Sequence, residues 1–326
     1  MSEKAEAGPP PADAARSRPF AEGFVPGLAY LGYRAGAAVV RRLPIAVGDL
    51  LARLAGALWF RADRRRRENV RRNMARVVGD GPSLDGLVRK AFHSYTRYWL
   101  ETFRLARYGE EDLETMVEAV GFDLIASALE QGRGLVAVTG HFGFYDLGLA
   151  WVGAHGHRVS TVAEVLKPRA LFEWFAGERE GRGWYVIPAS PGSAALRRLL
   201  GTLRRGEIIC LVGDRDLSRR GVWVRLFGED TTMPAGPSMM VAQTGAPLLL
   251  AGIHQTGPRR YRLEFNELPY ERTGDETVDI PVIAQRIADA VEQLVRRAPE
   301  QWHLFSTNWP SDEPHLPPRG RRAGRR

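Results

Sequence analysis

The sequence predicts an α/β protein with a mostly parallel central sheet, flanked by helices on both faces and preceded by an N-terminal helical segment. From Met116 onward, short apolar strand-like segments alternate with helical ones, as in a parallel sheet covered on both faces. Before that point, residues 20–107 read as helices. The chain has 326 residues, 44% of them hydrophobic, which is enough for one large α/β domain or two small ones.

The N-terminal helices are unusually apolar and lie next to concentrated positive charge. Residues 24–33 carry no charge, Pro44 interrupts the pattern, and residues 49–60 resume it. Arginines interrupt these stretches, so none reaches the roughly 20 apolar residues of a membrane-spanning helix. More arginines crowd between Arg61 and Arg72. This combination favours a segment that lies on an anionic membrane, and the alternative is a helical layer over the core with its arginines in water.

The remaining elements follow in order along the chain. Residues 84–107 form a helix whose Phe92, Tyr95 and Trp99 share one face, which predicts core packing. The expected strands are 117–120, 134–139, 159–163, 184–188, 207–212, 222–227, 247–253 and 260–265. The expected helices are 123–131, 144–155, 169–182, 193–205, 237–243 and 282–297. We therefore expect a helical region (20–110) in one domain with an α/β core (111–310), between disordered tails at 1–19 and 311–326.

Charge and cysteine content narrow the possible functions. The net charge of +8 suits nucleic acid, anionic lipid or phosphorylated substrates. Cys210 is the only cysteine, which excludes disulfides and cysteine-rich metal sites and favours a reducing compartment. Residues 1–19 lack the basic start and apolar centre of a signal peptide.

His141 and Asp146 are the first candidate for chemistry. The strand 134–139 runs through Gly140 into His141, and Asp146 lies in the first turns of the next helix. Open α/β sheets bind ligands at the carboxyl ends of their strands. We expect Asp146 to orient the His141 ring, so that the free ring nitrogen can take a proton from a hydroxyl. The alternative is a turn histidine beside a helix-start carboxylate, with no catalytic role.

Other charged residues stand near the ends of neighbouring strands. Glu164 follows the third strand, Arg179 precedes the fourth, and Asp214-Arg215-Asp216 follows the fifth. Together with His141 they predict one site at the carboxyl edge of the sheet. The chain has no Walker-type loop, no G-x-G-x-x-G after a strand and no G-x-S-x-G elbow. Neither a second histidine at metal-ligand spacing from His141 nor a nucleic-acid-binding signature is present, so we expect no metal and no nucleic-acid partner.

The spacing from His141 to Asp146, H-x4-D after a strand, resembles the signature of glycerolipid-type acyltransferases. More specifically, the chain resembles the branch that contains lipid A lauroyl/myristoyl acyltransferases and phosphatidylinositol mannoside acyltransferases, and it is more similar to the second group. The resemblance covers roughly residues 20 to 310. The segments that carry it, in the same order as in that branch, are SYTRYW (94–99), TVAE (161–164), LKP (166–168), DRDL (214–217), FGE (227–229) and MPAGP (233–237).

The resemblance implies transfer of a fatty acyl chain from acyl-CoA to a hydroxyl of a membrane glycolipid, a mannose of phosphatidylinositol mannoside. It implies no cofactor beyond this co-substrate, and a peripheral or monotopic place on the cytoplasmic face of the cell membrane. The alternatives are a lipid A-type acyltransferase that uses acyl carrier protein and a non-catalytic lipid-binding protein. Backbone N–H groups of residues 140–143, or Arg179, are expected to hold the oxyanion.

The resemblance also assigns roles to individual residues. His141 and Asp146 are catalytic, and Asp214 assists the histidine where the mannoside enzymes carry a glutamate. The residues expected to bind substrate are Glu164, Arg179, Arg215 and Asp216. Between His141 and Asp146 the chain reads Phe-Gly-Phe-Tyr, which departs from the Ser/Asn-Trp pattern of close relatives.

Overall fold

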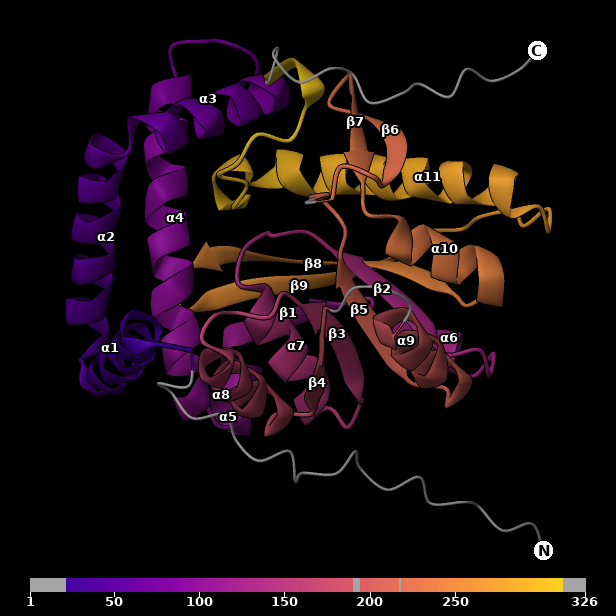
Figure 1. Cartoon of the computed structure of the whole chain (residues 1–326), viewed down its shortest axis with the longest axis horizontal. Coiled ribbons are helices and arrows are strands. Elements are labelled where there is room, and N and C mark those ends of the chain that lie inside the picture. The colour runs from indigo at the N-terminus through magenta and orange to yellow at the C-terminus, as the bar shows by residue number, and fades with distance from the viewer. Residues whose placement is uncertain (1–21, 190–193, 217, 313–326) are drawn as a thin grey trace, which may run out of the picture.

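The computed structural model describes residues 22–189, 194–216 and 218–312, and both expected tails lie wholly or mostly outside these ranges. Within them, the main sheet has seven strands in the order β1-β9-β8-β2-β5-β3-β4 (Figure 1). Every pairing in it is parallel except that of β8 with β9, which confirms the predicted mostly parallel sheet. Its strands are β1 (Val117–Val120), β2 (Leu135–Thr139), β3 (Val159–Ala163), β4 (Trp184–Pro188), β5 (Ile208–Val212), β8 (Leu248–Gly257) and β9 (Arg260–Glu267).

The expected strand at 222–227 lies outside this sheet. It forms β6 (Val222–Leu226), which pairs antiparallel with β7 (Glu229–Met233) in a separate hairpin. The two loop residues, Phe227 and Gly228, both have positive φ (50° and 78°), as a two-residue type I′ hairpin turn requires. The sequence interpretation missed β7, because its polar residues lack the pattern of a buried strand.

Strand β2 lies in the middle of the sheet and is buried along its whole length. Its side chains alternate between two cores. Val136 and Val138 belong to the core formed with α9 (Ala194–Arg204), α10 (Ala235–Thr244) and α11 (Glu276–Arg297). Leu135 and Ala137 belong to the core on the opposite face, formed with α5 (Glu110–Met116), α6 (Asp123–Leu129) and α7 (Tyr145–Ala154). Helices therefore cover both faces, as predicted, and α8 (Arg169–Glu180) packs against the edge strand β4.

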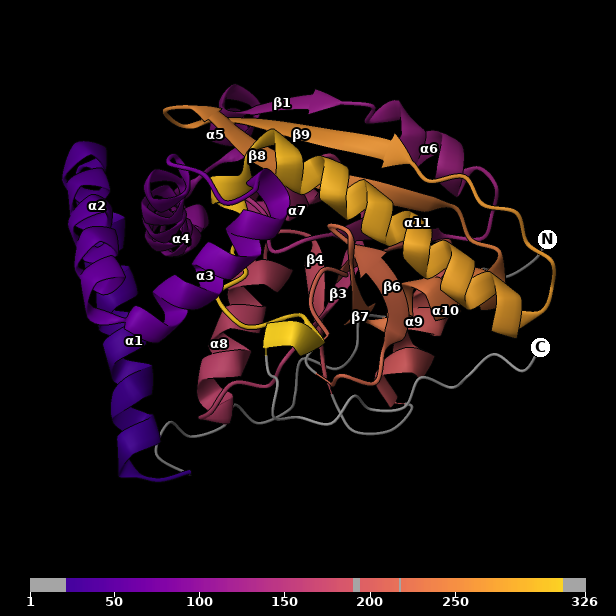
Figure 2. The same cartoon turned by 90° about the horizontal axis from the view of Figure 1, so that it is seen from above.

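The N-terminal region is helical as predicted, with the expected break at Pro44. Figures 1 and 2 both show α2 on the outside, with α4 between it and the rest of the molecule. The aromatic face of α4 packs inward, and Phe92 lies 4.8 Å from Trp59 of α2, measured between ring centroids. The elements here are α1 (Phe24–Arg42), α2 (Ile45–Ala62), α3 (Arg64–Val78), α4 (Leu84–Arg104) and the 3₁₀ turn η1 (Leu105–Arg107).

Helices α1 and α2 expose much apolar surface. The exposed fractions of Phe24, Val25 and Leu58 are 70%, 75% and 67%. Within the described ranges, no helix combines the length and the apolar character needed to cross a membrane. The other large apolar residues exposed on these two helices are Leu28, Leu31, Tyr33, Val39, Ile45, Val47, Leu50, Leu51 and Leu54.

After α11 the chain turns back across the molecule as a segment that we call the C-terminal strap, residues 298–312. It contains two 3₁₀ turns, η2 (Pro299–Gln301) and η3 (Pro310–Asp312). The Asn73 side chain of α3 donates hydrogen bonds to the carbonyls of Leu304 and Ser306 at 2.8 and 3.1 Å. Phe305 stacks on Trp59 with centroids 4.9 Å apart. The helical region and the strap are thus packed together beside the carboxyl edge of β2.

Candidate active site

His141 pairs with Asp214, and the sheet explains why. Strands β2 and β5 are parallel neighbours, with Thr139 paired to Val212. His141 and Asp214 each lie two residues beyond this pair, so their side chains emerge together at the carboxyl edge. The His141 Nδ1 atom lies 2.9 Å from Asp214 Oδ1. The His141 side chain is 34% exposed and that of Asp214 is fully buried, so the carboxylate supports a ring that faces solvent on its other side.

The prediction that Asp146 orients His141 is wrong. Asp146 is buried in the first turn of α7, and Arg179 of α8 donates a hydrogen bond to its Oδ2 at 3.0 Å. The Tyr98 and Thr102 hydroxyls of α4 lie 3.3 and 3.4 Å from the same oxygen. Asp146 therefore joins α4, α7 and α8 instead of holding the imidazole.

Asp214 carries the charge that a carboxylate needs to orient a histidine. Burial by itself would raise the pKa of Asp214. The charge of His141, with hydrogen bonds from His141 and Trp302, outweighs burial and holds that pKa below its usual value. Asp214 is therefore ionised at neutral pH and accepts the Nδ1 proton, which leaves Nε2 free to take another.

Arg179 keeps its charge in a buried setting. Burial alone would lower the pKa of Arg179, but the Asp146 carboxylate, followed by Tyr98 and Tyr145, raises it overall. Burial, followed by the charge of Asp146, raises the pKa of Tyr98 well above its usual value. The Tyr98 hydroxyl donates to the Tyr145 hydroxyl at 2.7 Å. This network fixes the start of α7 four residues after His141.

The other predicted site residues differ in how they are held. Glu164 is exposed just after β3, and Arg215 is half-buried beside Asp214; neither has a hydrogen-bond or ion-pair partner within the described ranges. Asp216 accepts hydrogen bonds from Ser218 and Gly221 of its own loop and from Thr232 of β7. Glu164 and Arg215 are thus available to a ligand, whereas Asp216 shapes the turn that leads to β6.

Two of the backbone N–H groups expected to hold an oxyanion have partners inside the protein. The N–H of Phe142 donates to the Gly140 carbonyl at 2.7 Å, and that of Gly143 to the Gln301 carbonyl at 2.9 Å. The N–H groups of Phe142 and Gly143 are therefore already engaged, which counts against these two as oxyanion donors.

Sequence reasoning missed two residues of the C-terminal strap. The Trp302 indole N–H donates to Asp214 Oδ2 at 2.8 Å, and the His303 backbone N–H donates to the His141 carbonyl at 2.7 Å. Burial, followed by the nearby His141, lowers the pKa of His303 to about 3, so its ring is neutral at pH 7. The Ser94 hydroxyl lies 3.0 Å from its Nε2 atom. The sequence carries no signal that these residues, far along the chain, reach the site.

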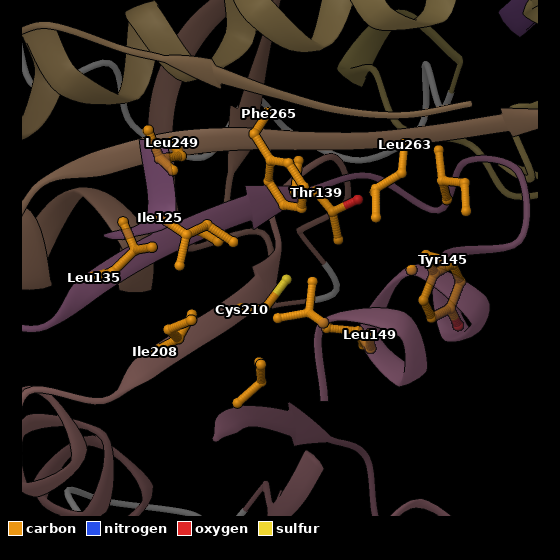
Figure 3. Close-up of a pocket in the computed structure, with 16 residues that line it drawn as sticks. Ile125, Leu135, Thr139, Tyr145, Leu149, Ile208, Cys210, Leu249, Leu263 and Phe265 are labelled. Carbon is orange, nitrogen blue, oxygen red and sulfur yellow. The ribbon is translucent and has the colours of Figure 1, made fainter. Parts of the chain in front are cut away.

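An apolar pocket follows β2 toward the site (Figure 3). Leu135, Ala137 and Thr139 line it in alternation along the strand, and Tyr145 lines it from α7. Its volume is about 40 Å³. A cavity that holds one water needs roughly 10–15 Å³, so this pocket has room for a few atoms at a time. Its apolar walls suit hydrocarbon better than water.

The described residues contain neither a cluster of side chains that could hold a metal ion nor a reactive thiol. Within residues 22–189, 194–216 and 218–312, no three His, Cys, Asp or Glu side chains are grouped to hold a metal ion. Burial raises the pKa of the Cys210 thiol, which also lines the apolar pocket, to about 12. The thiol is therefore protonated at neutral pH and is not a nucleophile. We therefore take the part-exposed imidazole of His141 as the candidate base.

Comparison with known proteins identifies the family of this chain. The model of the bacterial lipid A biosynthesis acyltransferase family matches residues 25–311. The chain belongs to this family. The phosphatidylinositol mannoside acyltransferase of Mycolicibacterium smegmatis is 35% identical over 285 residues, covering 86% of this chain and 91% of that protein. The enzyme of the same name from Mycobacterium tuberculosis is 35% identical over 286 residues, covering 86% and 88%.

Membership confirms the predicted enzyme class: the chain is an acyltransferase that acts on lipids. The resemblance inferred from the motif blocks is confirmed as well, since the family model spans all of them.

Proposed function

We propose that the enzyme transfers a fatty acyl chain from acyl-CoA to a mannose hydroxyl of phosphatidylinositol mannoside. The support is the name shared by the two mycobacterial relatives, each similar over most of both chains. The observation that carries the chemistry is the part-exposed imidazole of His141 held by the buried carboxylate of Asp214. This arrangement suits proton removal from an alcohol.

In the proposed reaction, Nε2 of His141 takes the proton from the acceptor hydroxyl as its oxygen attacks the thioester carbonyl carbon. The imidazolium that forms is stabilised by Asp214 at 2.9 Å. The C–S bond then breaks, and the leaving thiolate takes the proton from His141, which restores the neutral ring. The transfer is direct, without an acyl-enzyme, because no Ser, Thr or Cys side chain in the described ranges is hydrogen-bonded to His141, and the Cys210 thiol is buried and protonated. A positioned general base of this kind contributes typically 10²–10⁴-fold.

The apolar pocket is the proposed place for part of the acyl chain. It is lined by apolar side chains and reaches Thr139, two residues before His141. Each methylene transferred from water to such surroundings contributes about 0.8 kcal/mol. Because the pocket holds only a few atoms at its present size, a long chain requires α7 or its neighbours to move apart. Rates with acyl-CoA donors of increasing length should therefore rise until the available space is filled.

We also propose that the enzyme works on the cytoplasmic surface of the cell membrane, with α1 and α2 lying in the interface. The support is the exposed apolar surface of these helices and the exposed arginines at the α2–α3 corner, which include Arg61, Arg64 and Arg65. Apolar side chains beside basic ones suit anionic headgroups above hydrocarbon. Both lipid substrates would then be reached from the plane of the bilayer.

The proposal is tested by incubating the purified protein with labelled palmitoyl-CoA and a panel of lipids, read by mass spectrometry. We expect label on phosphatidylinositol mannoside, and a loss of about 10²–10⁴-fold in turnover for His141→Ala with the fold retained. Transfer only to lipid A precursors, or a requirement for acyl carrier protein as the donor, would instead support the lipid A-type alternative. Lipid binding without transfer to any acceptor would contradict the mechanism.

A further inference from the structure

Trp302 contacts the carboxylate that supports His141. The two oxygens of Asp214 have different partners: Oδ1 lies 2.9 Å from His141 Nδ1, and Oδ2 accepts the Trp302 indole N–H at 2.8 Å. Trp302 and Asp214 are both fully buried. Water therefore cannot replace the indole as a donor to Oδ2, and the direction of the carboxylate depends on where the indole lies.

The backbone fixes the indole with respect to the histidine. Trp302 forms an isolated antiparallel bridge with Phe142. On either side of it, the Gln301 carbonyl accepts the Gly143 N–H at 2.9 Å, and the His303 N–H donates to the His141 carbonyl at 2.7 Å. The strap thus runs alongside the turn that carries His141 and is hydrogen-bonded to it on both sides of the indole. A shift of the strap would move the indole and the histidine together.

We propose that Trp302 is a positioning residue that orients Asp214 and so sets the tautomer of His141. An indole has a donor and no acceptor, so it holds a carboxylate without being able to exchange a proton with it. With Oδ2 fixed, Oδ1 points at Nδ1 and keeps the proton there, which leaves Nε2 unprotonated for the acceptor hydroxyl. The kinetic part of this proposal rests on the acyltransfer proposed above; the structural part does not.

Trp302→Phe tests the proposal, because it removes the donor and keeps an aromatic ring. Trp309→Phe is the matched control. Trp309 lies in the same strap, is almost fully buried, and donates its indole N–H to the Leu226 carbonyl at 3.3 Å instead of to Asp214. Its ring packs edge-to-face on that of Trp302, with centroids 6.3 Å apart, so this control also reports what a loss of packing around Trp302 costs. Both variants lose the same atoms from the core, so a purely structural effect should be alike in the two. Thermal unfolding of each variant measures that shared cost.

The first readout is kinetic. We expect Trp302→Phe to lower kcat by about 10- to 100-fold, the loss that corresponds to one hydrogen bond to a charged group, with KM changed by less than about twofold. Trp309→Phe should leave both constants near the wild-type values. Equal losses of kcat in the two variants would overturn the proposal.

The second readout does not depend on turnover. In protein labelled with ¹⁵N-histidine, NMR should show the His141 ring with its proton on Nδ1 in the wild type and in Trp309→Phe, and a mixture of tautomers in Trp302→Phe. An unchanged tautomer in Trp302→Phe would refute the proposal. If wild-type protein transfers no acyl group to any acceptor, the proposed function fails, and this measurement still decides the role of Trp302.

A third measurement covers the case in which Trp302→Phe does not fold. The Trp302 indole proton signal in folded wild-type protein should move when Asp214 is changed to Asn, because its acceptor loses a charge. The Trp309 indole signal should stay in place. A Trp302 signal that does not respond would contradict the contact on which the proposal stands.

Discussion

At the level of single residues, Asp146 and Asp214 have different partners in the structure. Asp214 faces the imidazole of His141 at 2.9 Å, and Asp146 faces the guanidinium of Arg179 at 3.0 Å. Asp146 stands in the sequence motif, yet Asp214 is the carboxylate that contacts the imidazole. Asp146 instead joins α7 to α8 through Arg179, and substitutions should separate the two roles.

We expect Asp214→Asn to affect turnover more than stability. The asparagine amide can donate to Nδ1 and favour the wrong tautomer, which costs up to about 10⁴-fold in kcat in comparable sites. Asp146→Asn should instead leave Arg179, whose side chain is 23% exposed, without its charged partner. That loss should lower the free energy of unfolding by roughly 3 kcal/mol.

Urea unfolding and initial rates, measured on both variants, check this contrast. If Asp146→Asn were fully stable but inactive while Asp214→Asn stayed active, Asp146 and not Asp214 would be the carboxylate that supports His141.

The same residues show what the sequence can predict of the site. His141 and Asp214 can both be predicted as site residues, since each follows an apolar strand. The family resemblance assigns Asp214 to assist the histidine, and the structure agrees, because the two side chains lie 2.9 Å apart. Strand positions alone do not predict this pairing, because it depends on β5 lying next to β2 although β3 and β4 come between them in the chain. Strand order is set by packing over the whole sheet, so spacing along the chain points to the nearest carboxylate, Asp146, which is not the partner of His141. Trp302 was missed for a similar reason, since the strap returns to the site only after α11.

At the level of elements, the turn between β2 and α7 depends on Gly143. This residue has φ +58°, and a Cβ atom there would lie 1.9 Å from the carbonyl oxygen of Ile253 in β8. The turn therefore needs a glycine for its conformation and for its close approach to the neighbouring strand. The elements at either end of the turn were predicted nearly to the residue, whereas β7 was missed because its polar residues pair only with β6.

Gly143→Ala should therefore destabilise the protein by more than 4 kcal/mol or prevent folding, since backbone would have to move. Gly132→Ala is the control. Gly132 also has a positive φ, of +73°, but a Cβ atom there meets nothing within 4 Å. The control should cost only the roughly 1–2 kcal/mol of a left-handed alanine. Thermal and urea unfolding of the two variants give the comparison, and similar losses in both would show that the turn adapts.

At the level of the whole molecule, apolar surface and charge are unevenly placed. The large exposed apolar side chains gather on α1 and α2, the outermost helices in Figures 1 and 2. The arginines of the α2–α3 corner follow directly along the chain, and the net charge is +8. Helices that only covered a core would direct these side chains inward. Their exposure predicts that the protein binds bilayers through α1 and α2 and favours anionic ones.

Glutamate at Leu54 and Leu58, two exposed positions of α2, should weaken binding to phosphatidylinositol-containing vesicles at least tenfold in a co-sedimentation assay. Burying one leucine contributes about 1.5–3 kcal/mol, and the new charges add repulsion. Val278→Glu with Val282→Glu is the matched control, because these α11 valines are 47% and 46% exposed on a different element. Both double variants should keep the wild-type unfolding free energy to within about 0.5 kcal/mol per substitution, as surface changes do.

Raising the salt concentration from 0.1 to 1 M shortens the screening length from about 10 to about 3 Å. It should therefore weaken binding of the wild type to anionic vesicles more than to neutral ones. Two results would contradict membrane binding through α1 and α2. One is equal vesicle binding by the Leu54/Leu58 and Val278/Val282 double variants. The other is wild-type protein that stays in solution with every vesicle, and either result would mean that α1 and α2 have another partner.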